Sequence, residues 1–120
     1  MSVRVVHRGR TVWSPSLRVA RLLEADLAAL EKLVETPSGF VIDDSDEVHL
    51  DDQCFGTFVA ALLDQLERTD NPEIVALAAG PAQVAVALLH RLTGAWPQVS
   101  DRLDLIVSSA KSLVRESALP

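Results

Sequence analysis

Apolar residues recur at steps of three and four over most of the chain, the spacing that places them on one face of a helix. Segments of about 15–35, 52–68 and 100–117 follow this pattern. A fourth segment, 72–93, is apolar nearly all round, which is typical of a central helix buried by its neighbours. Short loops between helices favour antiparallel neighbours. The pattern predicts a mainly α, four-helix bundle-like domain.

Capping residues predict where these helices begin and end. Ser14 followed by Pro15 favours a helix start, because serine accepts an unpaired N–H and proline lacks one. Ser16, two residues later, is the competing N-cap. The other expected caps, in chain order, are Asp51 or Asp52, then Asn71 before Pro72, and Gly94 as the stop of the third helix.

The third predicted helix contains Gly80-Pro81, which we expect to kink or split it. Proline has no N–H to donate to the carbonyl four residues back. The charge-free stretch around it, 74–89, is shorter than the roughly 20 residues that a membrane span needs. The N-terminus is too charged for a signal peptide. We therefore expect no membrane span and a cytoplasmic protein.

Two segments carry β signals. Alternating valines around Arg8-Gly9-Arg10 predict a small N-terminal hairpin, 3–13, that turns at Gly9. Residues 40–50 join an apolar run to an acidic run and a second short apolar run. This segment is either a second loose hairpin or an ordered acidic loop.

Composition limits the remaining choices. The chain has 120 residues, 48% of them apolar, which suits a single domain, 1–120, with a core built mainly from leucine, valine and alanine. Cys54 is the single cysteine, so no disulfide within the chain and no thiolate metal cluster is expected. We interpret Cys54 as a small buried apolar residue.

Charge is distributed unevenly along the chain. The net charge is −6, yet residues 1–21 hold five arginines and no acid, and the remainder holds all 17 acidic residues against six basic ones. Either the basic arm pairs with an acidic part of the same fold, or it forms a separate anion-contacting patch. The mostly acidic exterior disfavours nucleic acid and anionic membranes as partners.

Acidic residues are densest between positions 43 and 52. Clustered carboxylates suit a hard cation. The calcium-loop template fails, however, because Val48 takes the fifth position and His49 the position that requires glycine. A solvated or helix-capping run and a protein-contact surface are the remaining readings of this acidic segment, whose acids are Asp43, Asp44, Asp46, Glu47, Asp51 and Asp52.

No catalytic pattern is present in the sequence. His7, His49 and His90 lack the i, i+4 spacing of a helical zinc pair. There is no GxSxG, SxxK or Cys–His pattern and no phosphate-binding glycine loop. We expect no catalytic residue, no metal and no cofactor, and an enzyme is the less favoured class.

Trp13 is the single residue with the most interesting position, between the predicted hairpin and the first helix. It either staples the strand onto the helix or lines a pocket with Arg10, Arg21 or the acidic segment. A deep apolar pocket beside Trp13 would favour a small-molecule binder, whereas a solid core there would exclude one.

The chain resembles a family of small actinobacterial, Streptomyces-type domains of unknown function. The resemblance covers about residues 3–94, and the residues after Trp96 look like an extension. It implies a bacterial cytosolic protein and transfers no site residue; abundant alanine, leucine and arginine with little lysine also fits a GC-rich genome. The residues that carry it are 11–16, 19–22, 37–39, Phe55, Phe58-Val59, 61–63 and Arg68-Thr69.

The first functional hypothesis is a non-enzymatic protein-binding module, immunity- or antitoxin-like or a small regulator, whose acidic surface meets a basic partner. The alternative is a small-molecule-binding protein or cofactor-free enzyme of specialised metabolism. A homodimer is the third option. Neutralisation of the acidic segment by the chain's own arginines would remove the first. The candidate binding residues are Arg10, Trp13, Arg21, Asp43, Asp44, Asp46, Glu47 and His49.

Overall fold

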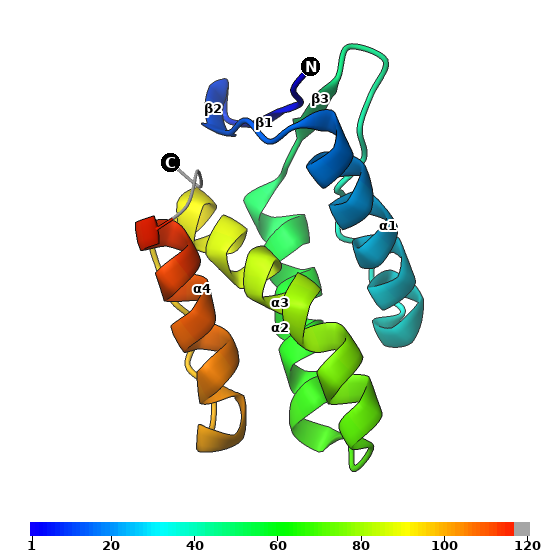
Figure 1. The fold of residues 1–120 in the computed structure, drawn as a ribbon, viewed down its shortest axis with the longest axis vertical. Coiled ribbons are helices and arrows are strands. Elements are labelled where there is room, and N and C mark those ends of the chain that lie inside the picture. Colours follow the sequence, from blue (N-terminus) through cyan, green and yellow to red (C-terminus); the bar gives the residue numbers. More distant parts are fainter. Residues whose placement is uncertain (117–120) are drawn as a thin grey trace.

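Four helices and a small sheet make up the computed structural model, which describes residues 1–116 (Figure 1). The mainly helical class and the N-terminal hairpin are confirmed. The predicted helix end at 117 lies outside the described residues. The elements are β1 (Arg4–His7), β2 (Arg10–Trp13), α1 (Leu17–Val34), β3 (Glu47–His49), α2 (Asp52–Arg68), α3 (Pro72–Thr93), a 3-10 turn (Asp101–Leu103) and α4 (Asp104–Glu116).

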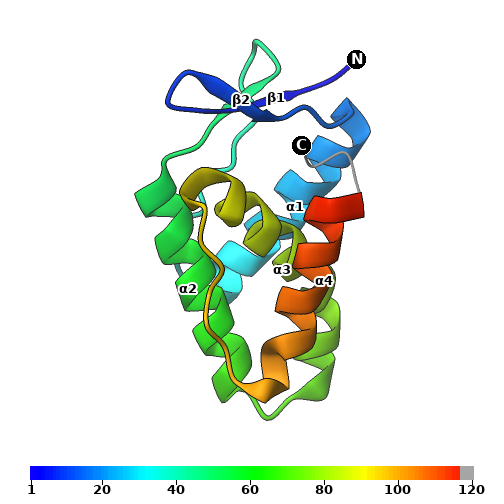
Figure 2. The same ribbon diagram turned by 90° about the vertical axis from the view of Figure 1, so that its left-hand side faces the viewer.

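The sheet lies at one end of the helices (Figure 1 and Figure 2) and has the order β2-β1-β3. Arg8 and Gly9 both have positive φ, 52° and 78°, as a two-residue turn between right-twisted strands requires. Strand β3 pairs with β1 in parallel, with Val48 opposite Val5. A second hairpin at 40–50 is therefore wrong: the segment is a loop that ends in β3, because buried Val48 completes the core beside β1.

Helix α1 begins at Leu17, so Ser16 and not Ser14 is its N-cap. The Ser16 side chain accepts a hydrogen bond from the Val19 N–H at 3.2 Å. The Pro15 carbonyl instead accepts from the Val3 N–H at 2.8 Å. The predicted start at 15 is wrong because the N-terminal strand holds Pro15 in extended pairing.

Loop 36–46 runs back along α1 and is held by two carboxylates of that helix. Glu31 Oε2 accepts hydrogen bonds from the backbone N–H and the hydroxyl of Ser38. The Ser38 hydroxyl oxygen accepts from the Phe40 N–H at 3.1 Å. Glu24 Oε2 accepts from the Ile42 N–H at 2.7 Å. These bonds satisfy backbone groups that no regular element pairs.

Helix α3 lies between α2 and α4, and α1 lies on the opposite side of the helical layer from α4 (Figure 1). Asn71 caps α3 as predicted, and Gly94 ends it with φ 77°. The helix is not split at Pro81; it stays helical on both sides, and its axis changes direction along its length (Figure 1). A bend is the usual response to an interior proline.

The surroundings of α3 differ between its two halves. Ala78 and the later core positions are buried, but Leu77 is 82% exposed. The prediction of a fully buried central helix is thus wrong for its first turns, since α1 does not cover them. By length and composition α3 could cross a membrane (hydropathy 1.6), which is weak evidence because core helices of soluble proteins pass the same test.

The last helical segment starts as a 3-10 turn, not as an α-helix at 100. Ser100 makes no capping bond. Its hydroxyl instead lies 2.7 Å from both carboxylate oxygens of Glu67. Arg102 donates to the backbone carbonyls of Glu67 and Thr69. These contacts hold the segment against the end of α2. They also engage the Ser100 hydroxyl, which would otherwise be free to cap an α-helix.

Candidate functional site

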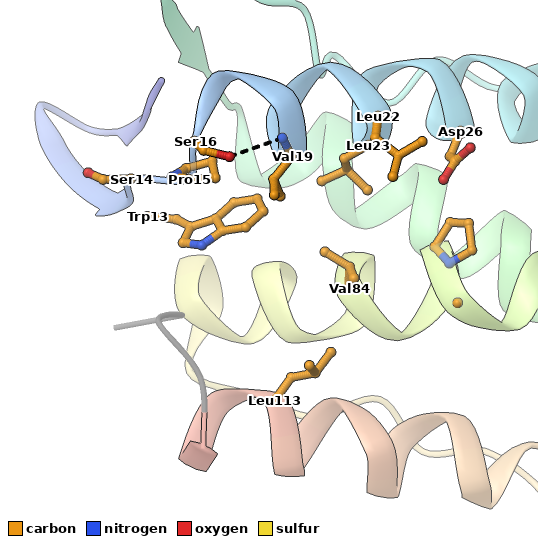
Figure 3. A pocket seen from close by; sticks show the side chains of 12 residues that line it. Trp13, Ser14, Pro15, Ser16, Val19, Leu22, Leu23, Asp26, Val84 and Leu113 are labelled. Atoms are coloured by element: carbon orange, nitrogen blue, oxygen red, sulfur yellow. Dashed lines mark hydrogen bonds between the residues drawn. The ribbon is translucent and has the colours of Figure 1, made fainter. Parts of the chain in front are cut away.

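A groove of about 590 Å³ lies between α1 and α3 (Figure 3). One wall comes from α1, the floor from the middle of α3, and Leu113 of α4 closes the far side. Trp13 and the chain that follows it close one end. The lining residues are Trp13, Ser14, Pro15, Ser16, Val19, Leu22, Leu23, Asp26, Gly80, Pro81, Val84 and Leu113.

The α1 wall follows from helical spacing. Val19, Leu22, Leu23 and Asp26 are separated by steps of three and four, so they share one face of the helix. Leu23 is buried, whereas Val19 is 49% and Leu22 64% exposed. The wall therefore begins at the core with Leu23 and continues to the apolar, solvent-exposed side chains of Val19 and Leu22.

The floor depends on Gly80-Pro81. A Cβ added at Gly80 would have no atom within 4 Å outside its own helix, so this position opens directly into space. Glycine before proline also avoids the clash between a Cβ and the proline ring that disfavours helical geometry. Val84, one turn later, completes the floor (Figure 3). Gly80, which has no side chain, therefore leaves space for the groove above α3, and the helix continues through Pro81.

Trp13 takes part in both the core and the groove. Its side chain is 7% exposed and packs in the main hydrophobic cluster. The indole lies between the start of α1 and α3 and forms the end of the groove (Figure 3). The two readings of Trp13 are thus not exclusive: the residue that staples β2 onto the helices also lines a pocket.

Chemically, the groove is apolar with few polar groups. Among the described residues, Asp26 is the single ionisable side chain that lines the groove, and no histidine, cysteine, lysine or arginine joins it there. The Ser16 hydroxyl is engaged as the α1 cap. One carboxylate without a second titratable partner does not form an acid–base pair or an activated nucleophile.

Two predicted partners of Trp13 do not reach this groove. Arg10 lies at the exposed start of β2 and Arg21 on the exposed side of α1, and neither lines the groove. The acidic segment is also absent from its lining. Of the predicted site residues within the described chain, Trp13 is the one that lines this groove.

The acidic segment is partly paired within the chain. Arg4 forms an ion pair with Glu47, and Arg8 lies 3.5 Å from Asp52. Desolvation raises the pKa of Asp52, but the Arg8 charge, a backbone hydrogen bond and His7 outweigh it, so the pKa lies below its ordinary value. Arg4 and Arg8 of the basic arm thus pair with the acidic segment, whereas no ion pair joins Arg10, Arg18 or Arg21 to it within residues 1–116.

Other acids of the segment shape the loop. Asp43 Oδ1 accepts hydrogen bonds from the N–H groups of Ser45 and Glu47. Ligand atoms of Asp43, Glu47 and His49 lie within 4.8 Å of one another, a donor set that suits a cation. The oxygens are already engaged, however: Glu47 binds Arg4 and contacts His49 Nε2 at 3.1 Å.

Within the described part of the segment, the side chains of Asp44 and Asp46 make no ion pair or hydrogen bond. Asp44 is exposed. Asp46 has φ 56°, and its carbonyl accepts a hydrogen bond from the Arg4 N–H at 3.0 Å. Asp51 caps α2 through the Gln53 N–H. Within this segment and among the described residues, arginines therefore pair with Glu47 and Asp52 only, and the other acids keep their charge without an arginine partner.

Sequence reasoning missed most of the groove, including Val19, Leu22, Asp26 and Val84. A signal was present, because Val19 and Leu22 lie beside the apolar stripe of α1 and not on it. That stripe runs through Ala20, Leu23 and Leu27, which are buried. Extra apolar residues beside a helix's core stripe indicate a second surface that the core does not bury.

The structure is a small, mainly helical fold with an apolar groove between helices. The chain belongs to a family of unknown function, DUF6086, whose model matches residues 1–118. The match includes α4, so the prediction that residues after Trp96 extend beyond the family is wrong. No curated protein and no solved structure matches the chain.

Proposed function

We propose that this protein is a non-enzymatic binding protein whose groove between α1 and α3 takes a small apolar molecule. The observation that carries the proposal is the groove's size and lining: about 590 Å³, apolar walls, a tryptophan at one end and one carboxylate. Small-molecule sites typically have volumes of about 300–1,000 Å³ and a few placed polar groups among apolar ones.

The pairing of the acidic segment also supports this choice over an acidic docking surface. Arg4 and Arg8 engage Glu47 and Asp52, which reduces the charge that a basic partner would meet. The groove, by contrast, has an open apolar lining. We infer that the four helices form a bundle-like arrangement that is open on the α1 side. We expect the protein to act in the cytoplasm of an actinobacterial-type host.

A protein-binding module, immunity- or antitoxin-like or regulatory, is the second candidate. The observation that favours it is the exposure of Leu22 (64%) and Leu77 (82%). Leu77 precedes Pro81 of the groove by four residues, one turn earlier on α3. An amphipathic helix of a partner, or of a second copy of this chain, would cover both leucines.

Binding of a neutral apolar dye tests the proposed function. N-phenylnaphthylamine gains fluorescence on leaving water, and we expect saturable binding at one site. Leu22→Gln should weaken this binding about fivefold or more, since it places an amide in the apolar wall, where burial costs about 1 kcal/mol or more. In a Trp96→Phe background, the emission of Trp13 should change as the dye binds.

Leu105→Gln is the matched control. Leu105 is 75% exposed on α4 and lies outside the groove, so this variant makes the same chemical change elsewhere. Its dye affinity should equal that of the wild type. Equal losses in both variants, or no saturable binding by the wild type, would refute the groove as the binding site.

A further inference from the structure

Asp26 is the feature of the groove that apolar packing does not explain. Its side chain is partly buried and lies at the opposite end of the groove from Trp13 (Figure 3). Within residues 1–116, no hydrogen bond or ion pair joins Asp26 to another side chain. A carboxylate in a partly desolvated apolar site costs free energy unless a positive group or a donor reaches it.

We propose that the ligand is a cationic amphiphile, an apolar body that ends in a primary amine, with the amine placed against Asp26. This inference rests on the proposed function and specifies its ligand. Asp26 follows Ser16, the N-cap of α1, by ten positions, which corresponds to about 15 Å of helix. A medium-length alkyl or flat aromatic body would therefore lie on Val19, Leu22 and Val84 and reach Trp13 with its apolar end.

A primary amine suits this end of the groove for a second reason. An ammonium group carries three donors and no acceptor. The Asp26 carboxylate, which accepts no hydrogen bond from another side chain within residues 1–116, provides the charged acceptor that such a group requires.

The net charge of the chain also favours a cationic ligand. This net charge of −6 attracts cations and repels anions on average. An anionic amphiphile would place two negative charges together at Asp26. A neutral alcohol of the same length would use the apolar wall without the ionic contact, so it isolates the contribution of the charge.

Three decyl compounds that differ in their head group test the inference. Decylamine, decanol and decanoate would each displace N-phenylnaphthylamine at pH 7 and low salt, below the concentrations at which they aggregate. Decylamine should bind about fivefold more tightly than decanol, the value of a partly exposed ion pair, and decanoate should bind most weakly. High salt should shrink the preference for the amine.

Variants assign the preference to one carboxylate. Asp26→Asn should lower decylamine affinity about fivefold and leave decanol unchanged, and Asp26→Glu should retain the preference. Asp70→Asn removes the same charge from an exposed position between α2 and α3 and should change neither compound. Circular dichroism would establish that all three variants fold.

The outcomes separate the two proposals. Equal affinity for decylamine and decanol, or the same loss in Asp70→Asn as in Asp26→Asn, would overturn the ionic contact and leave apolar binding in place. Failure of decanol and the dye to bind would overturn the proposed function, and the ligand assignment with it.

Discussion

Ser38 is the one polar residue classed as fully buried in the described part of the chain. It joins the loop to α1: its N–H and hydroxyl both donate to Glu31 of α1, and its oxygen accepts from the Phe40 N–H of the same loop. A hydroxyl donates and accepts at once, which a methyl group does not. This single side chain therefore fixes the path of the loop against α1.

Ser38→Ala should lower the free energy of unfolding by about 1–3 kcal/mol, because it leaves the Phe40 N–H and one carboxylate oxygen of Glu31 short of a partner. Urea denaturation of both proteins measures the difference. Ser45→Ala is the control, since the Ser45 side chain is exposed, and its effect should stay within about 0.5 kcal/mol. A similar loss in both variants would contradict the role of Ser38.

At the scale of elements, glycines in two helices have different roles. Gly56 lies in α2, where an added Cβ would meet Leu89 Cδ1 of α3 at 3.8 Å, an ordinary contact. Gly80 lies in α3 next to Pro81, where an added Cβ would clash with the proline ring. The first glycine costs helix stability without structural need, whereas the second permits a proline inside a helix.

Gly56→Ala should raise the free energy of unfolding by about 1 kcal/mol, the difference in helix propensity between the two residues. Gly80→Ala, with the same change of composition, should gain clearly less or lose stability. Thermal and urea denaturation of the pair measure both effects. Equal gains would show that Gly80 does not relieve strain at Pro81.

At the scale of the whole molecule, arginines of the N-terminal segment meet carboxylates of the acidic segment at the sheet. Arg4 on β1 pairs with Glu47 on β3, and Arg8 after β1 reaches Asp52 in the first turn of α2. His7 Nε2 also lies 3.6 Å from Asp52 Oδ1. Arg4 thus links two strands of the sheet, and Arg8 and His7 link the sheet to α2.

The contribution of Asp52 to stability should depend on pH. Because its pKa is lowered in the folded state, the contribution is fully present above the unfolded pKa, about 3.9, and is lost as pH falls through the lower folded value. Asp52→Asn should therefore destabilise the protein at pH 7 and converge with the wild type in acid. Denaturation at a series of pH values measures this difference. Asp44→Asn is the control: Asp44 is exposed and forms no ion pair in the described segment, so this variant should have the stability of the wild type at every pH.

The sequence by itself determined the helices, because their signals are local. Asp51 as a cap and the pattern after it place α2 at Asp52–Arg68, and Asn71-Pro72 with Gly94 bounds α3. Capping and turn geometry depend on a few adjacent residues, so they are readable from the chain. The Arg8-Gly9 turn was predictable for the same reason.

Tertiary structure alone decided the contacts between distant segments. The parallel pairing of β3 with β1, the start of α1 at Ser16 and the pairing of Arg4 with Glu47 each join residues far apart in the chain. The groove is of this kind too, since it exists only because α1 and α3 leave part of their apolar surfaces uncovered. Periodicity shows which face of a helix is apolar, but packing determines which part of that face meets another helix and which part stays open to a ligand.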